Sequence, residues 1–199
     1  MPIRSEGLPA TIRRRGFRIC LRAPRVTDTP AFLAAAKASR RLHGAWVHAP
    51  STPAQYEAFV RRYGRFARRD PLAVTHVALL ACRCDDGAIV GTFIFGEVVR
   101  GLFQSAYMGY YAFAPHAGDG YMGEALGLAL DTAFRRLKLH RIEVNVQPTN
   151  SRSLALVRRA GFRREGYSPR YVKIAGRWRD HVRLALTAED WRGARRGGR

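Results

Sequence analysis

The sequence predicts an α+β domain in which helices flank a mixed, mostly antiparallel sheet. Three successive runs of strand character are joined by short turns that contain glycine, an order typical of an antiparallel meander. A long helical pattern follows and leads into another strand, which indicates one parallel crossover. A chain of 199 residues is long enough for one core and leaves little room for a second domain.

The first elements are predicted to be a strand and two helices. Residues 17–22 alternate apolar and basic side chains, as a half-buried strand does. The alanine-rich residues 30–38 form the first helix. The second helix begins near Pro53, where Ser51 or Thr52 can cap the first free amides.

The meander and the crossover occupy the middle of the chain. The three strands of the meander are predicted over residues 73–82, 89–99 and 105–113. Apolar residues recur at helical spacing over 120–137, and apolar and polar residues alternate over 141–146. The strand that precedes this helix and the strand that follows it should therefore lie parallel.

The last elements are a short helix and two strands. The helix begins at Asn150 and ends at Gly161, since glycine readily adopts the left-handed conformation that closes a helix. The strands are predicted over residues 171–174 and 181–186, where they complete the sheet.

The chain divides into three parts: a basic N-terminal extension over residues 1–16, a folded domain over 17–187, and an Arg/Gly-rich tail over 188–199 that is predicted to be disordered. No apolar run approaches the roughly 20 residues needed to cross a bilayer, and the N-terminus lacks the apolar core of a signal peptide. A cytoplasmic protein without membrane contact is expected. The spacing of the three cysteines fits no zinc site, so we expect reduced thiols and no metal.

Charge is the most unusual property of the composition. Lysine and arginine number 35 against 15 aspartates and glutamates, a formal net charge of +20. Such a surface attracts phosphates, which indicates an acidic partner or nearby RNA. The basic residues are nearly all arginine and are spread along the chain, so solvated faces are the simpler explanation for most of them.

A turn punctuated by glycines leads directly into the long helix. Gly118, Gly120 and Gly123 fall just after the strand that ends at Phe113. Backbone amides at a helix N-terminus lie at the positive end of the helix dipole, so a pyrophosphate can bind there, and glycines let it approach closely. The alternative is a plain tight turn at the start of a helix.

The same glycines match a dinucleotide-binding fingerprint, Gly118-x-Gly120-x-x-Gly123, and Glu143 lies at the distance expected of a ribose-binding acid. In that fold the glycines follow the strand almost at once, and several βαβ units come after them. Here four residues intervene and the remaining chain is too short. The pattern therefore disfavours a nicotinamide cofactor.

The chain resembles the GNAT superfamily of N-acetyltransferases over about residues 17–187. The resemblance rests on the glycine loop, the crossover helix, and the residues Asn150-Ser151-Arg152-Ser153 and Gly161-Phe162. The acetyl-CoA motif of that family, Gln/Arg-x-x-Gly-x-Gly/Ala, is met by Pro115 to Gly120 except at its first position. Further runs are similar to those of the RimJ-type ribosomal-protein-alanine N-acetyltransferases, namely Val98 to Gly101, Glu165 to Tyr167, Gly176 to His181 and Leu186-Thr187.

The resemblance implies a GNAT fold with a splayed pair of parallel strands, and acetyl-CoA as the cosubstrate. The pantetheine would lie in the gap between the two strands and bond to the backbone of Tyr111, Ala112 and Phe113. A backbone amide there would hold the thioester oxygen as it gains negative charge. The remaining cofactor contacts implied are Asn150 and the loop amides of Gly118, Asp119, Gly120, Tyr121, Met122 and Gly123.

The resemblance also implies that Ser153 and Asn150 are catalytic residues for the protonation of the leaving thiolate. Ser153, three residues after Asn150, is the candidate acid, as in related ribosomal-protein acetyltransferases. Alternatively, Ser153 only caps its helix. The tyrosine that serves as the acid in another branch of the family falls on Val157, which has no proton to donate.

A general base for the acceptor amine is less well indicated. Asn145 falls at the position of a glutamate that serves as the base in another branch, and an amide cannot take up a proton. Glu143 lies two residues away on the same strand face, so it is the candidate base, acting through water. Glu97 is a second candidate, and both glutamates could equally be surface residues.

The implied function is direct transfer of an acetyl group to the N-terminal alanine of a ribosomal protein, by a monomer or a dimer. An α-amino group has a pKa of about 8 and is partly neutral at physiological pH, whereas a lysine amine near 10.4 is not. Two alternatives remain: acetylation of a small amine or aminoglycoside, and a non-catalytic ribosome- or RNA-binding role of the same fold. The basic chain offers few carboxylates for a polycation, and acetyl transfer in vitro would exclude the non-catalytic role.

Overall fold

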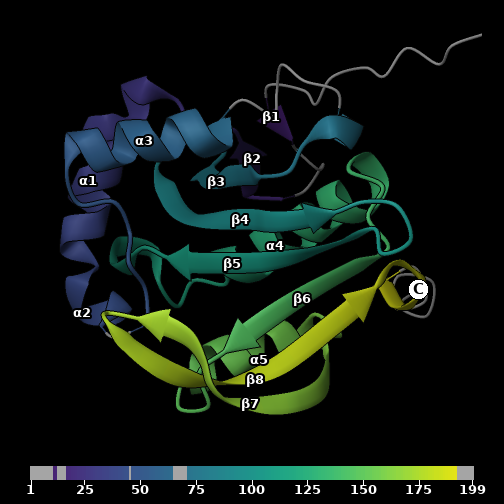
Figure 1. The fold of residues 1–199 in the computed structure, drawn as a ribbon. Helices are drawn as coiled ribbons and strands as arrows, with labels where there is room; N and C mark the ends of the chain where they lie inside the picture. Colours follow the sequence, from purple (N-terminus) through teal and green to yellow (C-terminus); the bar gives the residue numbers. More distant parts are fainter. Residues whose placement is uncertain (1–10, 13–16, 45, 65–70, 192–199) are drawn as a thin grey trace, which may run out of the picture.

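The computed structural model describes residues 11–12, 17–44, 46–64 and 71–191. Its centre is one eight-stranded sheet with the strand order β1-β2-β3-β4-β5-β6-β8-β7 (Figure 1). The strands are β1 (Thr11–Ile12), β2 (Ile19–Arg22), β3 (Val77–Arg83), β4 (Ile89–Val99), β5 (Ser105–Ala112), β6 (Arg141–Val146), β7 (Arg163–Ile174) and β8 (Arg177–Thr187). All neighbouring strands are antiparallel except β5 and β6, so the α+β fold with one parallel pair is confirmed.

Helices cover both faces of the sheet. Of the two caps predicted for α3, Ser51 and Thr52, the structure has Thr52. Its side chain accepts a hydrogen bond from the Gln55 amide. The α-helices are α1 (Thr29–Ala38), α2 (Arg40–His43), α3 (Pro53–Tyr63), α4 (Tyr121–Asp131) and α5 (Ser151–Arg159). Four further single turns are η1 (Val26–Asp28), η3 (Pro71–Ala73), η4 (Ala114–His116) and the π-helical η5 (Thr132–Arg136), which continues α4.

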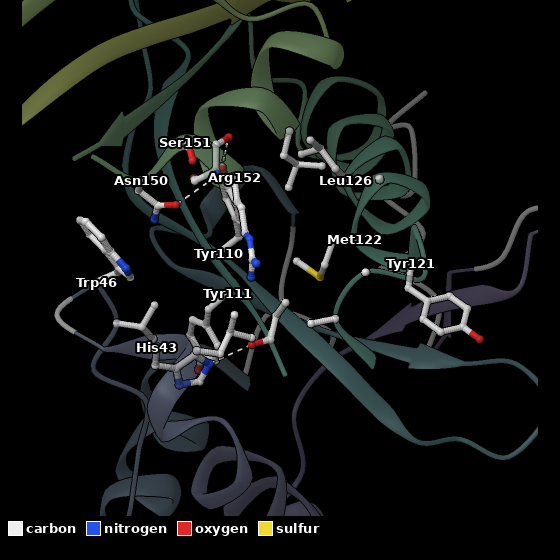
Figure 2. Close-up of a pocket in the computed structure, with 18 of the residues that line it drawn as sticks. His43, Trp46, Tyr110, Tyr111, Tyr121, Met122, Leu126, Asn150, Ser151 and Arg152 are labelled. Atoms are coloured by element: carbon white, nitrogen blue, oxygen red, sulfur yellow. Dashed lines mark hydrogen bonds between the residues drawn. The ribbon is translucent and has the colours of Figure 1, made fainter. Parts of the chain in front are cut away.

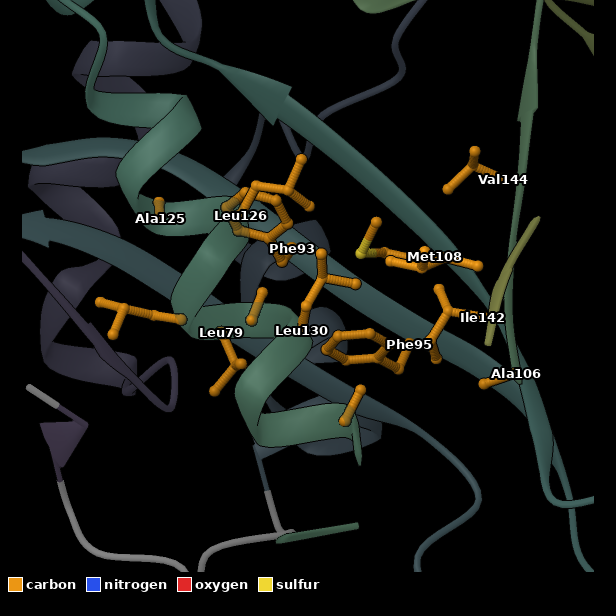
Figure 3. Close-up of a cluster of buried hydrophobic side chains, with 14 of the residues drawn as sticks. Leu79, Phe93, Phe95, Ala106, Met108, Ala125, Leu126, Leu130, Ile142 and Val144 are labelled. Carbon is orange, nitrogen blue, oxygen red and sulfur yellow. The ribbon is translucent and has the colours of Figure 1, made fainter. Parts of the chain in front are cut away.

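Two hydrophobic cores form because β3 and β4 are buried on both faces. On one face, Phe32 of α1 and Tyr56 of α3 pack against Phe113 beyond the end of β5. On the other face, Leu126 and Leu130 of α4 pack over the sheet, as Figure 3 shows. Burial on both faces explains why β3 reads as a continuous apolar run rather than as an alternating one.

The parallel pair of strands separates soon after it begins. β5 and β6 pair only from Ser105 opposite Arg141 to Tyr107 opposite Glu143. Beyond Tyr107 the two strands diverge, and α5 lies behind the divergence (Figure 1). The splayed pair expected from the resemblance is therefore present.

The C-terminal hairpin is longer than predicted. β7 and β8 reach far beyond the expected ranges of residues 171–174 and 181–186. Their pairing is interrupted by irregularities between Arg164 and Gly166 and between Ser168 and Val172. Most of β7 is exposed on both faces, so its side chains do not alternate between apolar and polar, which is the signal that the prediction used.

The packed part of the chain also extends beyond residues 17–187. β1 pairs with β2, and after β8 the side chain of Trp191 donates a hydrogen bond to Asp131 of α4 at 3.0 Å. Residues 1–10 and 13–16 of the predicted extension, and 192–199 of the predicted tail, lie outside the described residues. Within the part of the chain that is described, no helix is long and apolar enough to span a membrane.

Candidate active site

A large cavity lies between the end of β5 and the N-termini of α4 and α5 (Figure 2). Its volume is about 1020 Å³. Its wall includes α2 and the loop that follows it, the glycine loop before α4, and both ends of α5. Arg152 and Arg159 are the arginines of this wall, and no aspartate or glutamate belongs to it. A cationic cavity of this size suits a phosphorylated ligand.

The glycine loop has the backbone geometry of an anion site. Gly118 and Gly120 have φ angles of +109° and +81°, in the left-handed region that favours glycine. Gly120 is the residue immediately before the first turn of α4, whose first amides have no acceptor within the helix. Of the six predicted amides, the amide of Gly123 instead donates to the Gly120 carbonyl at 3.0 Å. The Gly123 amide is therefore not available to a ligand. The other five predicted amides lie in the glycine loop and at the start of α4, as expected.

Arg18 of the segment before β2 holds this loop in place. Its backbone amide and its Nε donate to the carboxylate of Glu124 at 3.0 Å and 2.7 Å. One terminal nitrogen of the same guanidinium donates to the Asp119 carbonyl at 3.0 Å. The guanidinium also lies 4.5 Å from the centre of the Tyr121 ring. Glu124 is thus paired with a cation, which reduces its repulsion of an anion at the start of α4.

The end of β5 presents only part of the predicted backbone to the gap. The Phe113 amide donates to the Val90 carbonyl of β4 at 2.8 Å, so it is not free for a ligand. Since backbone groups alternate between the two edges of a strand, Tyr111 also faces β4, and Tyr110 and Ala112 face the gap. The Ala112 carbonyl is bonded by Nε2 of His43 at 2.8 Å. Of the three predicted pantetheine contacts, only Ala112 faces the gap.

A second cavity of about 620 Å³ lies on the other side of the splayed strands. Its wall is formed by β5, β6, the C-terminal hairpin and the loop after α2. No aspartate, glutamate, lysine or arginine belongs to this wall. The residues that line both cavities are Trp46, Val47, Tyr110, Asn150 and Ser153.

Ser153 and Asn150 lie at the place where the two cavities meet. Asn150 is the N-cap of α5, and its Oδ1 accepts a hydrogen bond from the Ser153 amide at 3.1 Å. The alternative role of Ser153 as a helix cap is therefore excluded. The hydroxyl of Ser153 is hydrogen-bonded to the hydroxyl of Tyr110. Val157 is fully buried in the core.

Tyr110 is a residue of this junction that the sequence did not reveal. Its hydroxyl also donates to the Ser153 carbonyl at 3.2 Å. Burial raises the pKa of Tyr110 to about 12, so the phenol keeps its proton and supplies a donor beside Ser153. The only sequence signal was its place beside Tyr111 on the strand predicted to border the cofactor.

The two glutamates considered as bases lie elsewhere. The carboxylate of Glu143 accepts a hydrogen bond from Arg141 Nε at 3.0 Å, and Glu143 lines neither cavity. Glu97 has a side chain that is 70% exposed and lies 3.8 Å from His76. Arg141 in turn pairs with Glu165 of β7, which holds Glu143 in a network on the sheet surface. Neither carboxylate therefore lines either of the two cavities.

The family of the chain follows from this fold and from comparison with known proteins. The family model described as Acetyltransferase (GNAT) domain matches residues 18–163. The chain belongs to this family of acetyltransferases, whose members use acetyl-CoA.

Within the described residues, no cluster of histidine, cysteine, aspartate and glutamate could hold a metal ion.

Individual relatives extend the comparison. The uS5-alanine N-acetyltransferase of Escherichia coli is 45% identical over 107 residues, which is 54% of this chain and 55% of that protein. The probable N-acetyltransferase YjcK of Bacillus subtilis is 43% identical over 105 residues, 53% of this chain and 58% of that protein. The chain therefore spans little more than half the length of these curated relatives.

Two solved structures share the fold. The RimJ of Mycobacterium smegmatis in complex with CoA-disulfide is 30% identical, with a TM-score of 0.75 over 86% of this chain and 82% of that chain. The ribosomal-protein-S5-alanine acetyltransferase of Vibrio fischeri is 20% identical, with a TM-score of 0.78 over 91% of this chain and 98% of that chain. The second similarity shows the fold alone.

Proposed function

We propose that the protein transfers the acetyl group of acetyl-CoA to the α-amine of an N-terminal alanine on a ribosomal protein. The observation that carries the proposal is the pair of cavities that meet at Ser153 and Tyr110. The first cavity is bordered by the glycine loop and by two arginines, while no aspartate, glutamate, lysine or arginine lines the second. This division suits a phosphorylated donor on one side and an uncharged amine on the other.

The first cavity is the proposed acetyl-CoA site. The amides of Gly118, Asp119, Gly120, Tyr121 and Met122 would hold the pyrophosphate. Arg152 and Arg159 would add positive charge for phosphate groups. Backbone groups of Tyr110 and Ala112 would orient the pantetheine and the thioester oxygen in the gap. Bound there, acetyl-CoA supplies the activated acetyl group.

Ser153 is the proposed acid, and Asn150 is the residue that positions it. The hydrogen bond from Asn150 Oδ1 to the Ser153 amide fixes the start of α5. When the single proton of the Tyr110 hydroxyl turns from the Ser153 carbonyl to Ser153 Oγ, the serine proton is free to point toward the sulfur. Ser153 would thus protonate the thiolate as it leaves.

The proposed acceptor is an α-amine because the second cavity contains no carboxylate to bind a fixed positive charge. A polyamine or an aminoglycoside would bring several ammonium groups to this wall without a counter-charge. The name of the Escherichia coli relative supplies the ribosomal-protein class, and it would place the reaction in the cytoplasm. The net charge of +20 would favour acceptors presented on ribosomal RNA.

The test is intact-mass analysis of peptides incubated with the enzyme and acetyl-CoA. A peptide with a free N-terminal alanine should gain one acetyl group faster than a peptide with a blocked N-terminus and an internal lysine, and faster than spermidine. Assembling ribosomal particles should react faster than the free peptide, and this advantage should fall with salt. Equal rates on the blocked lysine peptide would contradict the α-amine assignment. Absence of transfer to every amine would favour the non-catalytic role.

A further inference from the structure

We propose that His181 is the general base of this reaction and accepts the proton of the acceptor amine in the second cavity. The inference rests on the proposed function, because it assigns a residue to the acceptor side of that site. It replaces the two glutamates that the sequence suggested, neither of which lines the cavity.

His181 lies on β8 at the wall of the second cavity. The residue is only 3% exposed and is one of the residues that line this cavity. It is opposite Ser168 of β7, and its ring centre is 6.3 Å from that of Tyr171. Asn145 of the neighbouring strand β6 lines the same cavity, two register positions along from His181. His181 is thus built into the acceptor wall and is not a surface histidine.

The tautomer of His181 leaves one nitrogen able to accept a proton. Nδ1 lies 2.9 Å from the carbonyl oxygen of Arg179. Since a carbonyl can only accept, Nδ1 carries the hydrogen and Nε2 has the lone pair. Nε2 has no hydrogen-bond partner among the described residues. This is the arrangement in which a histidine is oriented by one nitrogen and reacts through the other.

Burial keeps His181 neutral at physiological pH. Burial lowers its pKa below the usual 6.5, although the Arg179 carbonyl and Asp180 act in the opposite direction. Asp180 is itself bonded to the Tyr167 hydroxyl and to the Arg170 amide. The other titratable groups near the cavity are the hydroxyls of Tyr107, Tyr110 and Tyr171. Charged residues on the same sheet face are Arg179 and Arg183 on β8 and Arg141 and Glu143 on β6.

Asn145 provides a second, independent sign that this wall binds an N–H group. Its Oδ1 is buried and has no hydrogen-bond partner among the described residues. A buried amide oxygen without a donor is costly unless a ligand or water supplies one. The side chains of Asn145 and His181 both line this cavity, and each has a neutral acceptor, Oδ1 or Nε2, of the kind that binds the hydrogens of an uncharged amine. Asn145 would position the amine and His181 would deprotonate it.

The step balances without another reactant. The amine nitrogen forms a bond to the acetyl carbon, and the bond from that carbon to sulfur breaks. The proton lost by nitrogen passes to Nε2 of His181, and Ser153 gives its proton to the sulfur. His181 then loses its proton to water, and Ser153 regains one from water. The products are the amide and the free thiol of CoA.

The test uses His181→Asn, whose side-chain amide can still donate to the Arg179 carbonyl but cannot take up a proton. We expect kcat with an N-terminal alanine peptide to fall by at least about 10²-fold while the affinity for CoA stays unchanged by calorimetry. The wild-type kcat should rise with pH through an inflection below 6.5, and this inflection should be absent in the variant. His181→Gln is a second variant, and bound CoA verifies that each one is folded.

The matched control is His140→Asn, since His140 is exposed, pairs with Glu189 and lines neither cavity. The control should keep the wild-type kcat and pH profile. A His181→Asn or His181→Gln enzyme with wild-type kcat and the same inflection would overturn the inference while leaving the proposed function intact. A wild-type protein that acetylates no amine would overturn both.

Discussion

The hydroxyl of Tyr110 lies within hydrogen-bonding distance of both the Oγ and the carbonyl oxygen of Ser153, at the boundary between the two cavities. The contact joins β5, the strand before the crossover, to the first turn of α5, the helix after it. The proposed acid is therefore held from both sides of the crossover: by Tyr110 across the gap and by Asn150 within its own turn.

The first prediction concerns this pair. Ser153→Ala should lower kcat by roughly 10²-fold, because the proton donor is lost, and should leave CoA affinity unchanged. Tyr110→Phe should lower kcat by about tenfold, the value of one oriented hydrogen bond. The double variant should be little slower than Ser153→Ala, since both residues act on one proton. Steady-state kinetics measure all three, and a normal kcat in Ser153→Ala would remove the acid role.

The second prediction tests the glycine loop at a position without backbone strain. Gly123 does not have a positive φ, and a Cβ added there would contact nothing within 4 Å. Gly123→Glu places a carboxylate at the wall of the first cavity and should weaken CoA binding at least tenfold by charge repulsion. Gly123→Ala is the matched control and should bind CoA normally. Equal calorimetric affinity of both variants would place the pyrophosphate elsewhere.

The third prediction compares two neighbouring arginines at the end of α5. Arg159 lines the first cavity, and Arg158 does not. Arg159→Gln should weaken CoA binding several-fold and make it less dependent on salt, because one phosphate contact is lost. Arg158→Gln should change neither quantity. Titrations at low and high salt distinguish the two, and similar effects of both variants would indicate only a general loss of positive charge.

The fourth prediction concerns Asp180, whose carboxylate accepts bonds from the Tyr167 hydroxyl at 2.5 Å and from the Arg170 amide at 2.7 Å. These bonds lower its pKa below the usual 3.8. A lowered pKa in the folded state adds stability that is present above about pH 4 and is lost as pH falls through the folded pKa. Asp180→Asn should therefore melt below the wild type at pH 7, and the difference should shrink below pH 4.

The same variant should loosen one wall of the second cavity. Arg170 has a φ of +49° within the irregular part of β7, directly before Tyr171 of that wall. Losing the Asp180 charge should raise the KM for the peptide a few-fold with less effect on kcat, since a positioning contact is weakened. A melting difference that is constant from pH 7 to pH 3 would contradict the assigned ionisation.

The fifth prediction measures the core beneath the site. Leu130 of α4 is fully buried, and Leu130→Ala should lower the free energy of unfolding by about 2–5 kcal/mol. Leu102 lies in the exposed turn between β4 and β5, and Leu102→Ala should change the free energy of unfolding by less than about 0.5 kcal/mol. Denaturant titration measures both values, provided that the dependence of the free energy of unfolding on denaturant concentration is the same in each variant. A small effect at Leu130 would mean that α4 is not packed as described.

Much of the fold could be predicted from the sequence because local periodicity determines it. The range predicted for β6, residues 141–146, is the range observed, since its side chains alternate between core and surface. The helix after the glycine loop and the helix that begins at Asn150 were also predicted, because residues within a few positions of each other set helix ends. The cap itself is Asn150 and not Ser153. The short α2 was missed because a single turn shows no periodicity.

The acceptor side of the site was decided by tertiary structure. His181, Asn145 and Trp46 meet around one cavity although long stretches of chain separate them, and only strand pairing and the position of the α2 loop bring them together. Glu143 appeared available on its strand, but pairing with Arg141 removes it from the cavity. The chain by itself therefore determines the elements, the glycine loop before α4 and the position of Ser153 in the first turn of α5, because these depend on neighbours in sequence. Which side chain can remove a proton depends on burial, tautomer and ion pairing across the sheet, and these exist only after folding.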